Sequence, residues 1–427
     1  HMRESCFDRL LLLIKSMLPQ SERLPADFYR AKKMVNDLGL GFMKIDACPN
    51  HCMLYYKDDA DKTSCCICKH DRFKPKRGDK SKQKDVPYKS LRYFPITPRL
   101  QRLFMSSRTA GHMTWHAERV RRDEGEMSHP ADGEAWAHFS RTHPYFSRDP
   151  RNVRLGLCTD GFNPFGGSVA SYSCWPVFLT PYNLPPGMCM KRENLFLSLL
   201  IPGPKSPGKN IDIYLRPLID ELKLLWSDGV LCYDASRKQN FNLKAALMWT
   251  ISDFPAYGML SGWSTHGRLA CPYCMEDSKS FVLKSGGKSC WFDCHRRFLP
   301  SDHPFRKQKD SFMKNTIVME EVDMERVSGG NMARRVQNVP TVTQLAGSTR
   351  QIPGFGKDHN WVKQSIFWEL PYWSTLLIRH NLDVMHIEKN VFDNVFNTVM
   401  DVKGKTKDNV KARVDLKVLC KRPELEL

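Results

Sequence analysis

The chain has 427 residues, of which 41% are hydrophobic and 11% aromatic, enough to fill the cores of two or three domains and to exclude a disordered tail. Lys and Arg outnumber Asp and Glu by 65 to 46, and the net charge of +19 favours a polyanionic partner, above all nucleic acid. A basic surface that only keeps the chain in solution is the alternative. No apolar run approaches the roughly 18 residues of a membrane span, so we expect a soluble chain with no membrane partner.

Residues 1–45 are predicted to form a helical N-terminal segment. Apolar side chains recur at helical spacing from Cys6 to Leu18, a turn follows at Pro19, and a second helix is expected near residues 28–38. No signal peptide is recognisable in this leucine-rich start. The 15 cysteines of the chain are therefore expected to stay reduced, so that closely spaced pairs indicate metal ligands rather than disulfides.

Residues 46–75 carry two such pairs, Cys48-x3-Cys52 and Cys65-x2-Cys68, separated by a polar loop. This spacing is typical of the two knuckles of a zinc ribbon, in which four thiolates bind one structural Zn²⁺. Cys66 and His51 are rival ligands, and ordinary buried cysteines are the alternative interpretation. We predict a zinc-ribbon-like module with Cys48, Cys52, Cys65 and Cys68 as its ligands.

Residues 76–150 are predicted to form a basic linker followed by helices. The run from 69 to 92 holds ten Lys and Arg against three Asp and is interrupted by proline and glycine, which indicates a flexible segment. Residues 99–122 add an arginine-rich helical stretch. Both parts are compatible with contact to a DNA backbone, and the first also with a nuclear address; a solvated linker and an ordinary solvated helix face are the alternatives.

Residues 151–303 have the pattern of an α/β core. VRLGLCTD, YSCWPVFLTPYNLP and NLFLSLLIPG predict a three-stranded meander, a helix is expected over 212–226, and GVLCYD and AALMWTISD predict a hairpin and a returning strand. Three strands, a helix and a returning strand indicate an RNase H-like mixed sheet flanked by helices.

Asp160 and Asp253 end the first and the last of these strands. A carboxylate at the end of a buried strand is costly unless something pairs with it, and in this fold carboxylates at neighbouring strand ends bind two Mg²⁺ or Mn²⁺ ions for phosphodiester cleavage and strand transfer. A helix cap or a turn residue is the alternative role for either aspartate.

Several strings then show a resemblance to a known family: CTDGFNPFG, VFLTPYNLPPGMCMK, WTISDFPAYGMLSGWSTHGRLACPYC, CHRRFLPSDHPFR and RHNLDVMHIEKNV. They resemble the plant CACTA (En/Spm-type) transposase family over nearly the whole chain. The resemblance implies a nuclear, DNA-binding, Mg²⁺-dependent DDE recombinase that cuts transposon ends and joins them to target DNA. It also implies catalytic carboxylates at Asp160 and Asp253 and a homo-oligomer when two ends are synapsed.

The pair Cys271 and Cys274 in CPYC corresponds to a zinc-binding pair beside the active site of related transposases and recombinases. His295 and His303 are the local candidates to complete a Cys2His2 set, although in the related recombinases both histidines come from much farther along the chain. A loop histidine before Pro304 is the alternative for His303.

Glu388, in DVMHIEKNV on a predicted helix with His380 and His386 nearby, is the candidate third carboxylate. The family's own glutamate belongs to a later segment, and we expect this chain to end before it. Glu388 is then a solvent-facing helix residue, which is the alternative interpretation.

Residues 304–356 are polar and are predicted to form a loop or insertion, whereas 357–427 should pack back onto the sheet as a helical, truncated C-terminal part. The leading hypothesis is a transposase with a DDE site that is incomplete in this chain. A non-catalytic DNA-binding remnant or domesticated derivative is the second hypothesis, and a zinc-stabilised protein-interaction scaffold is the third.

Overall fold

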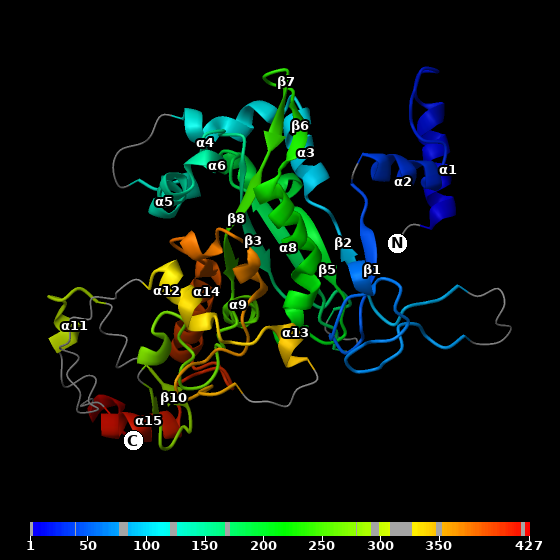
Figure 1. Ribbon diagram of the computed structural model, residues 1–427. Helices are drawn as coiled ribbons and strands as arrows, with labels where there is room; N and C mark the ends of the chain where they lie inside the picture. Colours follow the sequence, from blue (N-terminus) through cyan, green and yellow to red (C-terminus); the bar gives the residue numbers. More distant parts are fainter. Residues whose placement is uncertain are drawn as a thin grey trace. The chain divides into compact units, whose positions relative to one another are not determined.

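The computed structural model describes residues 3–38, 40–76, 84–119, 126–166, 171–278, 280–291, 299–307, 327–346, 352–419 and 423–427 (Figure 1). The chain divides into two compact units. The first consists of His1–Pro207 and Ile213–Met248, and the second of Gly208–Asp212 and Trp249–Leu427. Both units are built from segments that are far apart in the sequence.

A mixed sheet of seven strands organises the fold, and its order is β1-β2-β5-β4-β3-β8-β11. The strands are β1 (Met43–Asp46), β2 (Ser90–Tyr93), β3 (Val153–Thr159), β4 (Trp175–Pro181), β5 (Phe196–Ile201), β8 (Ala245–Ser252) and β11 (His380–Leu382). Strand β8 begins in the first unit and ends in the second. The sheet and its flanking helices confirm the expected α/β fold class.

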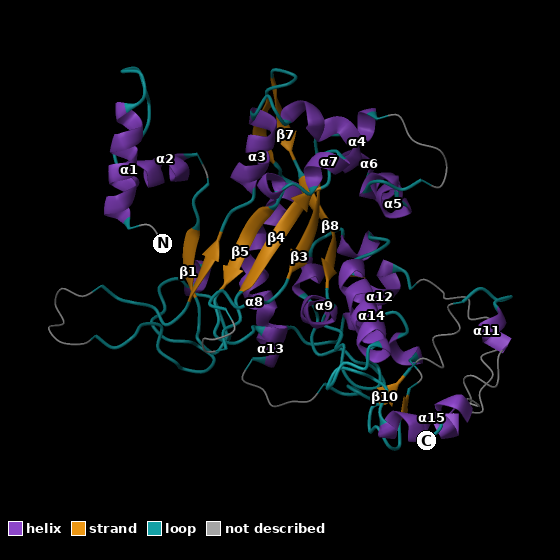
Figure 2. Ribbon diagram, turned by 180° about the vertical axis from the view of Figure 1, so that it is seen from behind, coloured by secondary structure: helices purple, strands orange, loops and turns teal. Residues whose placement is uncertain are grey.

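The predicted meander is confirmed. Strands β3, β4 and β5 pair antiparallel, with Leu157 opposite Leu179 and Val177 opposite Leu199 (Figure 2). Their side chains are buried along almost their whole length, as expected for strands covered on both faces. Strands β2 and β1 continue the antiparallel order beyond β5.

Helix α8 (Ile211–Ser227) covers one face of these strands (Figures 1 and 2). Its apolar side chains recur at helical spacing and are buried, as the pattern predicted. Glu221 on this helix accepts hydrogen bonds from the backbone N–H groups of Ile96 (3.0 Å) and Thr97 (2.8 Å). A carboxylate at these unpaired donors stabilises the start of α3 (Thr97–Met105).

The first unit contains further helices and a hairpin. Helices α1 (Glu4–Ser16) and α2 (Phe28–Asp37) form the predicted N-terminal segment, and Asp27 caps α2 by accepting the Arg30 N–H. The predicted hairpin is formed by β6 (Val230–Asp234) and β7 (Gln239–Leu243). Short helices complete the unit: α4 (Trp115–Glu118), α5 (Glu134–Thr142), α6 (Pro144–Ser147) and α7 (Pro186–Cys189).

The predicted linker over residues 69–92 is partly wrong. Ser90–Tyr93 form strand β2, with Leu91 and Tyr93 buried and Arg92 exposed, and Lys74 N–H donates to Val86 O at 2.8 Å. Residues 77–83 of this stretch lie outside the described residues. The period-two alternation of a four-residue strand is hidden in the sequence by the surrounding lysines.

The second unit combines short helices with irregular chain. It contains α9 (Phe254–Ser261), α11 (Pro304–Lys307), α12 (Gly329–Val336), α13 (Val342–Leu345), α14 (Val384–Val399), α15 (Val410–Leu419) and a small hairpin of β9 (Phe281–Val282) and β10 (Ser289–Cys290). A buried cluster around Trp263, Leu269, Val336 and Trp361 forms its core. Gly262 ends α9 at φ +85°, and a Cβ there would clash with the Lys363 carbonyl oxygen, so that only glycine fits.

Two predictions for the second unit differ from the structure. Part of the polar stretch 304–356 forms α12, which Ser328 caps and whose Val336 belongs to the core. Most of residues 361–382 form irregular chain, two short 3₁₀ turns and the edge strand β11, where helices were expected. Helix α14 exists, but it buries none of its residues.

Among the helices that the structure describes, none has the length and apolarity that a bilayer crossing requires.

Candidate metal centres and strand-end carboxylates

Each of the two predicted cysteine knuckles contains a tight, hydrogen-bonded turn. In the first, His51 N–H donates to Cys48 O at 2.9 Å, and in the second Lys69 N–H donates to Cys65 O at 3.0 Å. His51 (φ 57°) and Lys69 (φ 60°) both adopt the left-handed conformation. Such tight turns aim the two cysteines of each knuckle at a common point, as metal-binding knuckles require.

The four predicted ligands gather into one cluster. The sulfur atoms of Cys48, Cys52, Cys65 and Cys68 all lie within 4.8 Å of one another. In a tetrahedral site, Zn–S bonds of about 2.3 Å separate the sulfurs by about 3.8 Å. Within the described parts of the chain, no other group of three or more Cys, His, Asp or Glu ligand atoms lies this close together. The cluster could therefore hold a structural metal such as zinc.

The electrostatics of the cluster also fit a cation. Burial raises the pKa of the Cys48 thiol to about 11 and raises that of Cys52 as well. Burial acts in the same direction on Cys68, but hydrogen bonds from the Asn50 amide and the His70 backbone lower its pKa to about 6. Four neighbouring thiolates would repel one another, and a divalent cation supplies the compensating charge.

The two rival ligands have other partners. Cys66 is exposed, with its sulfur 3.4 Å from Met53 Sδ. The Nδ1 atom of His51 lies 2.8 Å from the Tyr214 hydroxyl, and burial together with the charges of Lys89 and Lys205 lowers the pKa of His51 to about 4. The structure thus brings the predicted set together and leaves Cys66 and His51 out of it.

Asp160 directly follows β3, and Asp253 directly follows β8. Strand β3 is buried up to Thr159 except for Cys158, but Asp160 is exposed and accepts the Gly161 N–H at 2.6 Å. Asp253 is half-buried and caps α9 by accepting the Ala256 N–H at 2.9 Å through Oδ1. The alternative cap role of Asp253 is therefore real. Within the described residues, neither carboxylate uses its Oδ2 in a hydrogen bond.

Strands β3 and β8 are neighbours in the sheet. The N–H of Val153, the first residue of β3, donates to the carbonyl oxygen of Lys244, which directly precedes β8, at 2.8 Å. The two strands therefore start at the same edge and run in the same direction.

The CPYC turn resembles the second knuckle of the first cluster, in which Cys68 N–H lies 3.5 Å from Cys65 Sγ. Cys274 N–H lies 3.3 Å from Cys271 Sγ, and Met275 N–H donates to Cys271 O at 2.9 Å. His303 does not join the pair, because its Nδ1 accepts the Phe305 N–H at 3.2 Å and it is absent from the one compact ligand group found among the described residues. His295 lies outside the described residues. A second zinc site at Cys271 and Cys274 stays a prediction.

Glu388 lies exposed near the start of α14. Of its predicted neighbours, His380 has a structural role: its Nδ1 lies 2.9 Å from Thr250 Oγ1 and its ring packs against Phe367, Trp373 and Tyr257. Burial lowers the pKa of His380 to about 3, so that the ring is neutral at physiological pH.

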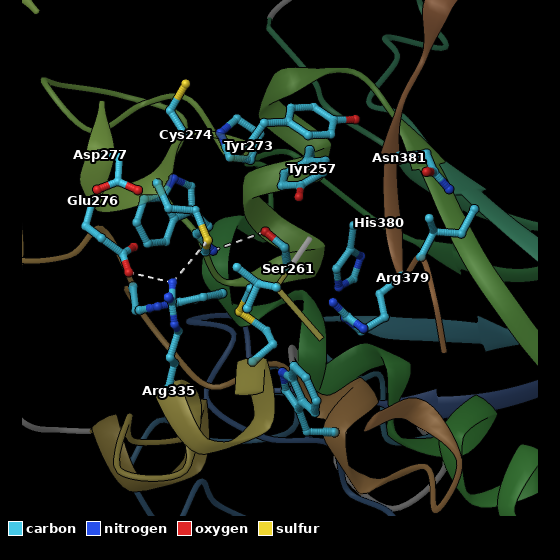
Figure 3. Close-up of a pocket in the computed structure, with 18 of the residues that line it drawn as sticks. Tyr257, Ser261, Tyr273, Cys274, Glu276, Asp277, Arg335, Arg379, His380 and Asn381 are labelled. Atoms are coloured by element: carbon cyan, nitrogen blue, oxygen red, sulfur yellow. Dashed lines mark hydrogen bonds and ion pairs between the residues drawn. The ribbon is translucent and has the colours of Figure 1, made fainter. Parts of the chain in front are cut away.

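Sequence reasoning missed a pocket of about 720 Å³ in the second unit (Figure 3). It lies between α9, the CPYC turn, α12 and β11, and both aromatic and cationic side chains line it. The sequence contains a sign of this pocket, the many aromatic residues between Trp361 and Trp373, but the sequence alone predicts only that these residues pack onto the sheet.

A family model described as transposase family tnp2 matches residues 124–339, half of the chain. The chain belongs to this transposase family. The transposase part of the predicted resemblance is thereby confirmed, and membership implies that the protein acts on DNA. The matched region of this tnp2 transposase contains Asp160, Asp253 and the CPYC turn, but neither the four-cysteine cluster nor Glu388. A search of the curated proteins finds no match.

Proposed function

We propose that this tnp2-family protein is a CACTA-type transposase that cleaves and transfers DNA strands through a DDE site containing Asp160 and Asp253. One observation carries the proposal: the two aspartates directly follow strands that are neighbours in the sheet and that start at the same edge. Neighbouring strands with a common direction end at the same edge, which is the topology a shared metal site needs. Both residues also lie inside the region matched by the family model.

The donor chemistry supports a hard divalent cation. Carboxylate oxygens are the ligands that Mg²⁺ and Mn²⁺ prefer, and each aspartate has one oxygen held by a backbone N–H and the other available. The cap on α9 restricts the rotamer of Asp253, and the bond to Gly161 does the same for Asp160. When bound, the metal ions supply activation of water or of a 3′-hydroxyl and stabilisation of the leaving oxygen.

Glu388 is the proposed third carboxylate. Its support is its exposure at the start of α14, which leaves it accessible to a cation. It lies outside the matched family region, so its role rests on the variant experiment alone. Nuclear location and a homo-oligomeric state during synapsis belong to the same proposal, since a transposase that joins two DNA ends must reach chromosomal DNA and hold both ends.

The test is nicking of supercoiled plasmid by the purified chain in Mn²⁺, because it needs no knowledge of the cognate DNA ends. We expect Asp160→Asn and Asp253→Asn to lower the nicking rate at least a hundredfold, since removing a metal-ligand charge removes the cation's hold. Glu388→Gln should do the same if it is the third ligand. The matched control is Asp228→Asn, an exposed aspartate elsewhere in the first unit, which should nick at the wild-type rate. Nicking that survives Asp160→Asn would sink the assignment.

A second function, sequence-nonspecific DNA binding without cleavage, is favoured by the cap role of Asp253, because a cap alone is sufficient reason for an aspartate at that position. It predicts salt-sensitive DNA binding and no nicking in either Mg²⁺ or Mn²⁺ by a folded, zinc-loaded chain. The two functions are separated by the plasmid assay together with a binding measurement on the same preparation.

A further inference from the structure

The pocket of the second unit has the composition of a site for a flat polar ring. Tyr257 on α9 and Tyr273 in the CPYC turn present their rings on one side, and Arg379, which directly precedes the edge strand β11, and His380, which begins it, lie on another (Figure 3). Its volume of about 720 Å³ is in the range of sites that enclose a small molecule. It is therefore large enough for a nucleobase with its sugar.

Two side chains of this pocket have hydrogen-bonding capacity to offer. Arg379 donates to Leu376 O at 2.7 Å through Nη1, and within the described ranges its other guanidinium nitrogens have no hydrogen-bond acceptor. The Asn381 amide is half-buried and, in the same part of the chain, makes no side-chain hydrogen bond. An amide that is both donor and acceptor matches the edge of a base.

The charges around the pocket argue against two other occupants. Arg335 is already paired with Glu276 at 2.5 Å, and Asp277 adds a negative charge, so the lining is unsuited to a free phosphate group. The guanidinium of Arg379, 5.9 Å from the Trp368 ring centre, places a positive charge in the lining, which disfavours a ligand cation such as a methylated lysine. A neutral aromatic ring meets neither objection.

We propose that this pocket binds one unpaired nucleobase of a DNA strand, stacked on Tyr273 and read at its edge by Asn381. The choice of DNA rests on membership of a transposase family, whereas the pocket does not depend on the proposed catalytic aspartates. Tyr273 is the accessible stacking surface, since the residue is 56% exposed, whereas Trp263 and Trp361 are buried and pack against each other with their ring centres 5.0 Å apart. A base extruded from a duplex or present in a single strand would satisfy the site.

The experiment compares two probes on the wild-type full chain: an oligothymidine and an oligomer of equal length whose residues are abasic. Both carry the same phosphate charge, and no Mg²⁺ or Mn²⁺ is added, so that cleavage does not enter. We expect the base-bearing probe to bind about five- to hundredfold more tightly, the range for stacking of one base on an aromatic side chain. Equal affinities for the two probes would overturn the proposal.

Variants then locate the contact. Tyr273→Ala should abolish the preference for the base-bearing probe without changing the slope of log K against log salt concentration, because no phosphate contact is lost. Tyr273→Phe keeps the ring and should keep the preference, and Tyr145→Ala, an exposed tyrosine of the first unit, is the matched control. A preference that persists in Tyr273→Ala contradicts the pocket. Asp160→Asn should retain the preference, so that failure of the nicking assay and failure of this proposal are distinguishable.

Discussion

Single polar residues carry much of the structural information in this protein, and they separate structural from functional roles. Asp253 caps a helix while leaving one oxygen free, whereas His380 is enclosed by aromatic rings and is neutral. Sequence inspection noted His380 close to Glu388, the candidate third carboxylate. The contacts of the His380 ring with Phe367 and Trp373 show that His380 has a structural role, and the sequence alone does not reveal these contacts.

His380 makes the stability of the second unit dependent on pH. Its pKa is about 3 in the folded chain and about 6.5 when unfolded, so the unfolded state binds the proton first and stability is lost as the pH falls below 6.5. In the pH range where only the unfolded histidine titrates, the free energy of unfolding falls by at most about 1.4 kcal/mol for each unit that the pH falls. Solvent contact with the half-buried ring makes this loss smaller. Urea unfolding followed by tryptophan fluorescence at pH 7 and pH 5 measures it.

The variant His380→Gln removes this titrating group and should make the pH dependence smaller, while the contributions of His51, His116 and His129, whose pKa values burial also lowers, remain. His112→Gln, an exposed histidine in the first unit, is the control and should leave the dependence as in wild type. An unchanged pH dependence in His380→Gln would contradict the assignment of a buried neutral ring.

At the scale of elements, patterns were reliable where a period extends over many residues. The buried strands of the meander and the helix from Ile211 to Ser227 were predicted because their apolar residues follow a clear period. Strand β2 and helix α12 were missed because four and eight residues within polar, lysine-rich or glycine-rich chain are too short for a period to emerge. Their formation depends on partners: β5 for the strand, and the core around Trp263 for the helix.

The two cysteine knuckles give a prediction at this scale. The purified chain should bind one Zn²⁺ at the cluster, and Cys65→Ser should lose it, because a buried sulfur ligand has no substitute nearby. Cys66→Ser is the matched control, since Cys66 lies outside the ligand set, and it should retain the ion. Metal analysis of the two variants beside wild type, with allowance for a second ion at Cys271 and Cys274, measures the difference. Equal zinc content in Cys65→Ser and wild type would exclude the cluster.

At the scale of the whole molecule, charge and chain connectivity matter most. The net charge of +19 suits a protein of a transposase family, because DNA binding is dominated by neutralisation of phosphates.

The second unit includes the short segment Gly208–Asp212. There Asp212 pairs with the fully buried Lys363 and accepts the Ile366 N–H at 3.0 Å. Removing one partner of such a buried pair costs about 3–5 kcal/mol.

The charge predicts how DNA binding responds to salt. If six or more phosphates are neutralised, affinity for a random duplex should fall at least about a thousandfold between 50 and 200 mM salt. Fluorescence anisotropy at several salt concentrations gives the slope of log K against log salt concentration. A slope near zero would mean that the positive charges do not contact DNA and would favour the interaction-scaffold hypothesis.

The sequence by itself determined the α/β class, the meander, the four cysteines that cluster and the transposase resemblance, because these depend on local periods, fixed spacings and extended strings. Only the tertiary structure decided that Asp160 is exposed, that Asp253 caps a helix, that His303 stays apart from Cys271 and Cys274 among the described residues, and that a pocket lies beside the CPYC turn. These properties arise from contacts between residues far apart in the chain. Burial and ligand geometry are set by such contacts, and no local pattern encodes them.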